Sequence, residues 1–145
     1  MRRQLLALAL LAPAAAGCAS LGGGPEMPGS FVAEGIAPAD APAISSTVAS
    51  FVTMRAPPGP IALDAPEGDP ADLAEKVAAD LRAAGHAVSP SGRNRLSYRV
   101  EEHARGAYLV RIALDGERAA RILARGHGGR LEPATPYTVT LAEAK

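Results

Sequence analysis

The sequence predicts an α+β domain in which one or two helices pack on an antiparallel sheet of about four strands. Three observations support this fold class. A helical pattern runs over residues 69–84, alternating apolar and polar residues predict strands between residues 96 and 141, and a Gly- and Pro-rich stretch precedes the first predicted helix. Because a sheet with one apolar face must bury that face, we expect the helices to cover it. The domain is placed at residues 44–145.

The first 17 residues predict a secretory signal peptide. Arg2 and Arg3 precede a short apolar run over residues 5–12, and small residues then lead to Cys18, the only Cys of the chain. A charged start, a short apolar centre and a small-residue cleavage region are typical of such signals. The apolar run is shorter than the roughly 20 residues that span a bilayer.

Ala15, Ala16 and Gly17 before Cys18 resemble a bacterial lipoprotein signal, although Leu is preferred where Ala15 stands. Such a signal implies that the Cys18 thiol is diacylated and that the chain is cut before Cys18 and then acylated on its new amine. Several acyl chains attach a protein to a membrane in effect permanently. Ala19 lacks the acidic character that retains enterobacterial lipoproteins at the inner membrane. We therefore expect an outer-membrane, lipid-anchored protein that faces the periplasm.

Residues 18–43, which begin with the lipidated Cys, predict a flexible tether. The stretch is rich in Gly, Pro, Ala and Ser and shows no sustained period of 2 or 3.6 residues. Phe31, Val32 and Ile36 are unusual in a linker. Two interpretations stay open for them: residual local packing, or a short segment that docks on a partner and orders there.

Two helices are predicted. Ile44–Arg55 has apolar residues at helical spacing and candidate caps at Ser45 or Ser46, although its β-branched residues also favour a strand. The stretch from Asp69 to Ala84 shows the stronger pattern. Asp69 is a suitable N-cap, Pro70 suits the first helical position, and Gly85 supplies a left-handed stop.

Strands are predicted from alternation of apolar and polar residues. A short candidate covers residues 61–63, and longer ones follow at 96–101, 108–114, 117–124 and 137–141. Asp115 and Gly116 form a tight-turn signal between two of them. The long strands follow the second helix in order, which predicts an antiparallel meander.

Composition excludes several classes of function. The chain has 15 basic residues (Lys and Arg) and 15 acidic residues (Asp and Glu). It therefore lacks the net positive charge that would attract it to nucleic acid. Aromatic residues make up 3% of the chain, which argues against stacking platforms for bases. With a single Cys the chain has no internal disulfide. One Cys and three His are also not the usual ligand set of a structural zinc site. We expect no cofactor and no metal.

No catalytic motif stands out, so we expect no enzyme. His86, His103 and His127 lie at turns and loops without an obvious partner. Glu101 and Glu102 are neighbours in a predicted strand and would point to opposite faces. The loop at residues 126–129 is Gly-rich, but no helix follows it to bind a phosphate, so a turn is predicted.

Charge is unevenly distributed along the domain. Residues 45–81 hold two basic and six acidic residues, whereas residues 82–130 hold ten Arg and four acidic residues. Two interpretations are weighed equally: a solvated strand face, or a surface that binds an acidic partner protein or anionic lipid headgroups. The candidates for that surface are Arg99, Arg111, Arg118 and Arg121.

Four features in order resemble the TrbH family of conjugal-transfer lipoproteins. They are the lipoprotein signal, the run FVAEG at residues 31–35, the stretch LAEKVAADLRAAGHAV at 73–88, and LSYRV, YLVRIAL and LEPATPYTV between 96 and 139. The order and total length carry this resemblance more than any single motif.

The resemblance implies an outer-membrane-anchored structural or assembly component of a conjugative type IV secretion (mating-pair formation) apparatus. It also implies contacts with other core subunits of the channel and no catalytic residues. A ring-type oligomer is a further expectation, although no heptad or interface stripe predicts it. The alternative is an unrelated envelope lipoprotein that acts as a binding or assembly module for lipid or outer-membrane proteins.

Overall fold

The computed structural model describes residues 29–66 and 72–141, which form two helices and eight strands. This confirms an α+β fold. In chain order the elements are β1 (Phe31–Val32), α1 (Ala41–Arg55), β2 (Pro60–Leu63), α2 (Leu73–Ala83), β3 (Ala87–Val88), β4 (Asn94–Ala104), β5 (Ala107–Leu114), β6 (Glu117–Arg125), β7 (Leu131–Pro133) and β8 (Thr138–Leu141).

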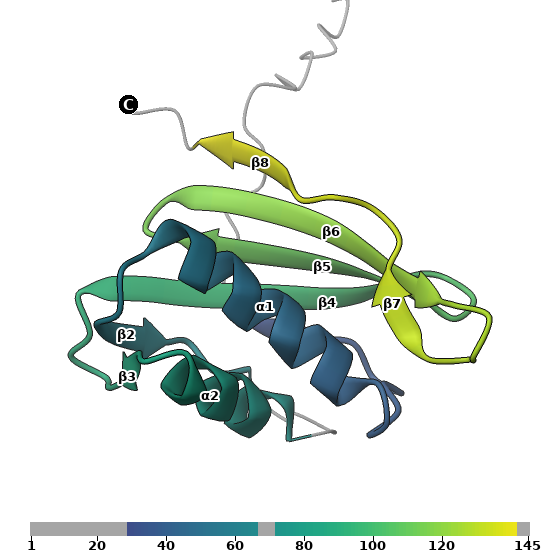
Figure 1. The fold of residues 1–145 in the computed structure, drawn as a ribbon, viewed down its shortest axis with the longest axis horizontal. Helices are drawn as coiled ribbons and strands as arrows, with labels where there is room; N and C mark the ends of the chain where they lie inside the picture. The colour runs from purple at the N-terminus through teal and green to yellow at the C-terminus, as the bar shows by residue number, and fades with distance from the viewer. Residues whose placement is uncertain (1–28, 67–71, 142–145) are drawn as a thin grey trace, which may run out of the picture.

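The centre of the sheet is the predicted meander of β4, β5 and β6 (Figure 1). Two short strands lie along each of its edges. On one side β1 and β2 pair parallel with β4, and β3 extends the sheet beyond β2; on the other side β7 and β8 pair antiparallel with β6. The expected antiparallel arrangement is therefore confirmed for β4 to β8, but the sheet has eight strands rather than about four, and the pairings of β1, β2 and β3 are parallel. Two-residue and three-residue strands are too short for alternation to show in a sequence.

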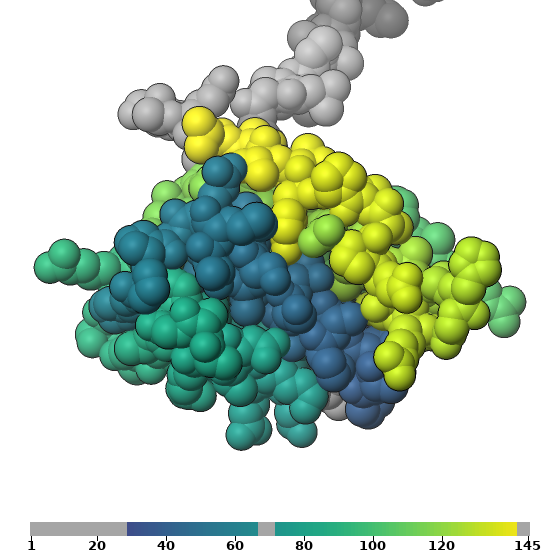
Figure 2. Space-filling view, viewed as in Figure 1, coloured from purple at the N-terminus to yellow at the C-terminus, as the bar shows by residue number. Residues whose placement is uncertain are grey.

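Both helices lie on the same side of the sheet, and the sheet curls around α1 (Figure 1). The inward-facing residues of the meander alternate as expected: Tyr98, Val110 and Ile112 are fully buried. Phe51 from α1 and Leu81 from α2 complete the core beneath them. The space-filling view shows α1, α2 and the C-terminal residues as a continuous layer over this side (Figure 2).

Helix α1 begins three residues before the predicted start, with Asp40 as its N-cap residue. The Ser45 hydroxyl does not cap it; it instead donates to the Asp80 carboxylate of α2 at 2.8 Å. The segment is a helix and not a strand, and each turn of that helix places an apolar residue in the core. Ile44, Val48 and Val52 are fully buried.

Helix α2 is amphipathic, as its pattern predicted, and the structure shows it from Leu73 to Ala83. Asp72 occupies its N-cap position with a positive φ of 50° and without a side-chain cap. The expected cap at Asp69 and the following Pro70 lie outside the described residues. Gly85 ends the helix with φ 91°, which confirms the predicted left-handed stop.

The stretch expected to be a tether is part of the domain from Gly29 onward. Phe31 and Val32 form β1, and Ile36 is buried in the core with 4% of its surface exposed. Residues 18–28 lie outside the described residues. The boundary expected between residues 43 and 44 therefore falls inside α1. The Gly- and Pro-rich composition was misleading here because the segment gains its order from β4 and the core rather than from its own period.

Ser30 joins this segment to the rest of the sheet edge. Its hydroxyl accepts a hydrogen bond from the Tyr98 N–H at 3.1 Å and donates one to the Asp64 carbonyl. Ser30 thus satisfies a backbone donor of β4 in the gap where β2 has ended and β1 has not yet begun.

We predict that Ser30→Ala lowers the free energy of unfolding by about 1–2 kcal/mol, because it leaves the Tyr98 N–H without its acceptor. Chemical denaturation of the purified chain measures this. Ser50→Ala, at an exposed position of α1, is the matched control and should change stability by no more than about 0.5 kcal/mol. Equal effects of the two substitutions would contradict the role given to Ser30.

Candidate functional site

The strand register sorts the four candidate arginines between the two faces of the sheet. Directly paired residues of antiparallel strands share a face. Arg99 pairs with Arg111, and Arg118 pairs with Ala113, two residues beyond Arg111 on β5. These three arginines therefore lie on the face opposite the helices, which we call the outer face.

Arg121 does not belong with the other three. It pairs with the buried Val110 and so lies on the helix side of the sheet. Its guanidinium stacks over the Tyr137 ring at 4.5 Å, and its Nε donates to the Thr135 carbonyl at 2.8 Å. Tyr137 in turn donates its hydroxyl hydrogen to the Thr47 carbonyl of α1 at 2.6 Å. Arg121 thus fastens the C-terminal segment over α1.

On the outer face, a carboxylate links two of the arginines. Glu101 lies 3.6 Å from the Arg99 guanidinium and 3.3 Å from that of Arg111. Arg99 also stacks over the Phe31 ring, 5.0 Å from its centroid. Because these side chains are partly exposed, the ion pairs add little stability but hold the guanidinium groups in place.

Two further residues belong to the outer face, and the sequence argument did not select them. Arg95 lies on β4 on the same side as Arg99, since strand side chains alternate, and it is exposed. It stands one residue before the strand predicted at 96–101, and its spacing of four residues from Arg99 was a signal that could have found it. Phe31 was noticed only as an odd linker residue, because no local pattern reveals a two-residue strand.

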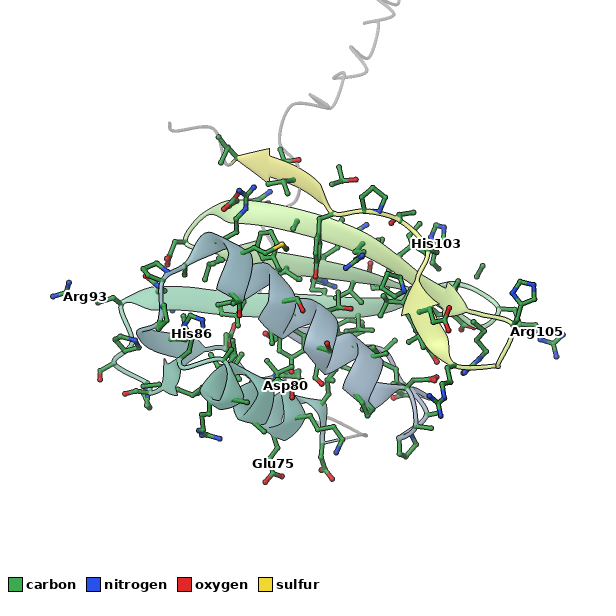
Figure 3. The ribbon with its side chains drawn as sticks, viewed as in Figure 1. Glu75, Asp80, His86, Arg93, His103 and Arg105 are labelled. Atoms are coloured by element: carbon green, nitrogen blue, oxygen red, sulfur yellow. The ribbon has the colours of Figure 1, made fainter. Side chains whose placement is uncertain are left out.

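The histidines do not form a catalytic constellation among the described residues. His86 is 2% exposed, between α2 and β3, and neither ring nitrogen has a hydrogen-bond partner there. His103 is exposed and lies far from His86 (Figure 3). Within residues 29–66 and 72–141, no group of three His, Cys, Asp or Glu residues is placed to hold a metal ion.

The Gly-rich loop at residues 126–129 is a turn that connects β6 to β7, as predicted. The Gly126 N–H donates to the Arg130 carbonyl and the Gly129 N–H donates to the Gly126 carbonyl, both at 2.9 Å. The Gly129 carbonyl accepts from the Arg125 guanidinium at 3.0 Å. These three hydrogen bonds hold the loop as a turn.

One titratable cluster joins the start of α1 to the sheet. The Asp40 carboxylate is nearly buried and accepts two hydrogen bonds from the Arg125 guanidinium, at 2.6 and 3.0 Å. Burial, with the nearby Asp40 charge, raises the pKa of Tyr108 above its usual value of 10.0. The hydrogen bond to Asp40 raises the pKa of Arg125 further. Tyr108 and Arg125 both keep their protons at neutral pH, so the cluster fits structural attachment better than proton transfer.

A sequence model of the family described as "Conjugal transfer protein TrbH" matches residues 26–143. No match to the chain was found among curated proteins or among solved structures. Neither helix of the described segments has the length and apolar character to cross a bilayer.

We predict that the free energy of unfolding falls as pH rises above about 10, because the unfolded chain releases the Tyr108 proton before the folded chain does. Denaturant unfolding of the wild type and of Tyr108→Phe, followed from pH 8 to pH 11, tests this. The variant should show a shallower fall above pH 10. Parallel curves for the two proteins would show that Tyr108 does not contribute.

Proposed function

The chain belongs to the TrbH family of conjugal transfer proteins, and from this premise we propose that it is an outer-membrane-anchored lipoprotein with a structural role in a conjugative type IV secretion apparatus. The observation that carries the proposal is the extent of the family match. It spans residues 26–143 and so contains the whole described domain. The role in transfer therefore falls on this domain and not on a small attached motif.

The N-terminal sequence supports the lipid anchor. Cys18 follows an apolar run and small residues, and the family match begins eight residues after it. In this proposal residues 1–17 direct export and Cys18 holds the acyl chains. The domain then faces the periplasm, where it contacts other subunits of the channel.

The form of the domain supports a structural role. Its interior is filled by large side chains, and its titratable cluster at Asp40, Tyr108 and Arg125 attaches α1 to the sheet. Short strands occupy both edges of the meander, and the outer face carries positive side chains in fixed positions. These are features of a rigid module that offers surfaces to partners.

A second candidate is a binding module for lipid or outer-membrane proteins outside conjugation, and the arginines of the outer face favour it. A lipid carrier, however, needs a large apolar cavity. One surface concavity of about 480 Å³ is lined in part by Asp64, Arg95 and Ser97. A larger one, of about 550 Å³, lies between α1 and α2 and is lined in part by Ser45, Lys76 and Asp80. Those polar walls do not suit an acyl chain, so we prefer the role in conjugation.

We predict that deletion of the gene from donor cells lowers the frequency of plasmid transfer by at least about tenfold, because a channel subunit would be missing. Mating assays measure this, with the wild-type gene supplied in trans as the control that restores transfer. Wild-type transfer frequency in the deletion strain would remove the conjugation proposal.

We also predict that Cys18→Ser abolishes acyl labelling and leaves transfer near the level of the deletion strain. Ala19→Asp is the sharper companion in an enterobacterial host, because it keeps the acylated Cys and redirects the protein to the inner membrane. Radiolabelled palmitate and membrane fractionation follow the two variants. Acyl labelling of Cys18→Ser at the wild-type level would show that the lipid is elsewhere or absent.

Affinity purification from cross-linked, detergent-solubilised outer membranes identifies the partners. We expect channel subunits with the wild type and fewer of them with Cys18→Ser. Recovery of only outer-membrane biogenesis factors would instead support the second candidate.

A further inference from the structure

The outer face is an open sheet surface. Both described helices lie on the other side, so within residues 29–66 and 72–141 no helix covers this face (Figure 1). Its side chains are half-buried or exposed, whereas those of the opposite face are mostly buried. A sheet face left open in this way is available to a partner outside the domain.

Positive charge dominates this face. Four arginines lie on it with two carboxylates: Glu101 lies between two of the arginines, and Glu132 of β7 pairs with Ala124, whose side chain is on the same face. Asp64 and Asp115 are near its margin, where Asp64 lines a concavity with Arg95 and Asp115 accepts the Arg95 N–H. The arginines are Arg95, Arg99, Arg111 and Arg118.

The helix side shows no such excess. Its arginines at the ends of α1 and β6 are paired with carboxylates: Arg55 with Glu117 at 2.7 Å, and Arg125 with Asp40 at 2.6 Å. Along α2, acidic and basic side chains nearly balance, and Glu75 points into solvent (Figure 3). The domain therefore presents one positive broad face.

Apolar groups lie among the arginines of the outer face. Phe31 is 44% exposed at the β1 edge, and Leu109 and Ile122 are half-buried on the neighbouring strands β5 and β6. Paired residues Leu109 and Ile122 share one face of the sheet, and that face is the outer one. Basic groups mixed with Phe and Leu are what a protein surface needs to rest at the headgroup level of an anionic bilayer.

The position of the expected anchor directs this face toward the membrane. Gly29, the first described residue, adjoins β1, and β1 contributes Phe31 to the outer face. Only residues 19–28 separate Gly29 from Cys18, so even a fully extended chain spans at most about 40 Å. That reach is similar to the roughly 30–35 Å diameter of a domain of this size. The chain thus leaves the domain beside the positive face and reaches the lipid within about one domain width.

We propose that the outer face lies against the anionic lipid headgroups of the membrane that holds Cys18, and that it orients the domain with α1 and α2 turned toward the periplasm. This rests on the lipid anchor of the proposed function. The arginines supply the attraction to phosphate groups, Phe31 enters the headgroup layer, and the anchor makes the contact local.

Binding of the unacylated chain to vesicles tests the face separately from the anchor. The protein is residues 18–145 with Cys18→Ser, which contains every residue of the described domain. Its partition coefficient is measured by co-flotation with vesicles of phosphatidylethanolamine and phosphatidylglycerol, and with phosphatidylcholine vesicles. We expect binding to the anionic vesicles only, and expect added salt to weaken it.

Arg99→Gln/Arg111→Gln should lower the partition coefficient by between about fivefold and about thirtyfold, since each arginine near an anionic surface contributes about fivefold. Arg95→Gln/Arg111→Gln is a second variant that keeps the stack of Arg99 on Phe31. Lys76→Gln/Arg82→Gln on α2 is the matched control, because it removes the same charge from the helix side and should leave binding unchanged. Thermal unfolding verifies that each variant is folded.

Equal losses in the outer-face and α2 variants would overturn the proposal, because the attraction would then be one of total charge. Equal binding to anionic and phosphatidylcholine vesicles would overturn it too. Outer-face variants that bind vesicles normally but lose cross-links to channel subunits in cells would assign the face to an acidic protein. A deletion strain with normal transfer would remove the role in conjugation without affecting the vesicle result.

Discussion

The attachment of α1 to the concave side of the sheet is the interaction on which the rest of the structure depends. An ion pair holds each end: Asp40 with Arg125 at the start of the helix, and Arg55 with Glu117 at its end. Glu117 and Arg125 are the first and last residues of β6, so the two ends of α1 are tied to the two ends of that strand in opposite order, while the helix packs on β5 and α2. Between the two pairs α1 buries its apolar residues under the curl of the sheet.

Helix α1 in turn holds the neighbouring elements. The Ser45 hydroxyl joins α1 to Asp80 of α2, and the Tyr137 hydroxyl joins it to the C-terminal segment. Helix α1 thus serves as the axis around which α2 and the C-terminal residues are placed, and the outer face remains open as a consequence.

The same arrangement explains why the four candidate arginines separate. Alternation places residues 118 and 121 of one strand on opposite faces, so no single surface can contain both. The sequence revealed the excess of arginine in this half of the chain, and it revealed the strands that carry it. The face of each arginine on β6 was harder to predict, because Ala119 and Ala120 interrupt the apolar alternation there and leave its phase uncertain. Pairing with Val110 and Ala113 of β5 resolves that phase.

The sequence predicts the elements whose apolar residues recur with a regular period. It does not predict the short elements that are ordered only by pairing with other parts of the chain. Helix α2 and strands β4 and β5 repeat their patterns over several turns or pairs, and they were found. Strand β1 has two residues and β7 has three, so neither can display a period. Strands β1 and β7 form because the long strands β4 and β6 have backbone N–H and C=O groups at their outer edges that need hydrogen-bond partners. The start of the domain was misplaced for the same reason, since Ile36 belongs to a core made by distant residues.

The early start of the domain bears on how a lipid anchor would act. A long tether would let the domain move freely above the membrane and would make its charge distribution irrelevant to its orientation. Ten residues between Cys18 and Gly29 give much less freedom. The chain enters the fold as β1, parallel to β4 and hydrogen-bonded to the longest strand of the sheet, with Ser30 continuing the edge toward β2. A pull at Cys18 would therefore be transmitted to the centre of the sheet. In the proposed attachment through Cys18, the short link, the strand that receives it and the positive face beside that strand would together favour one orientation of the domain at the membrane.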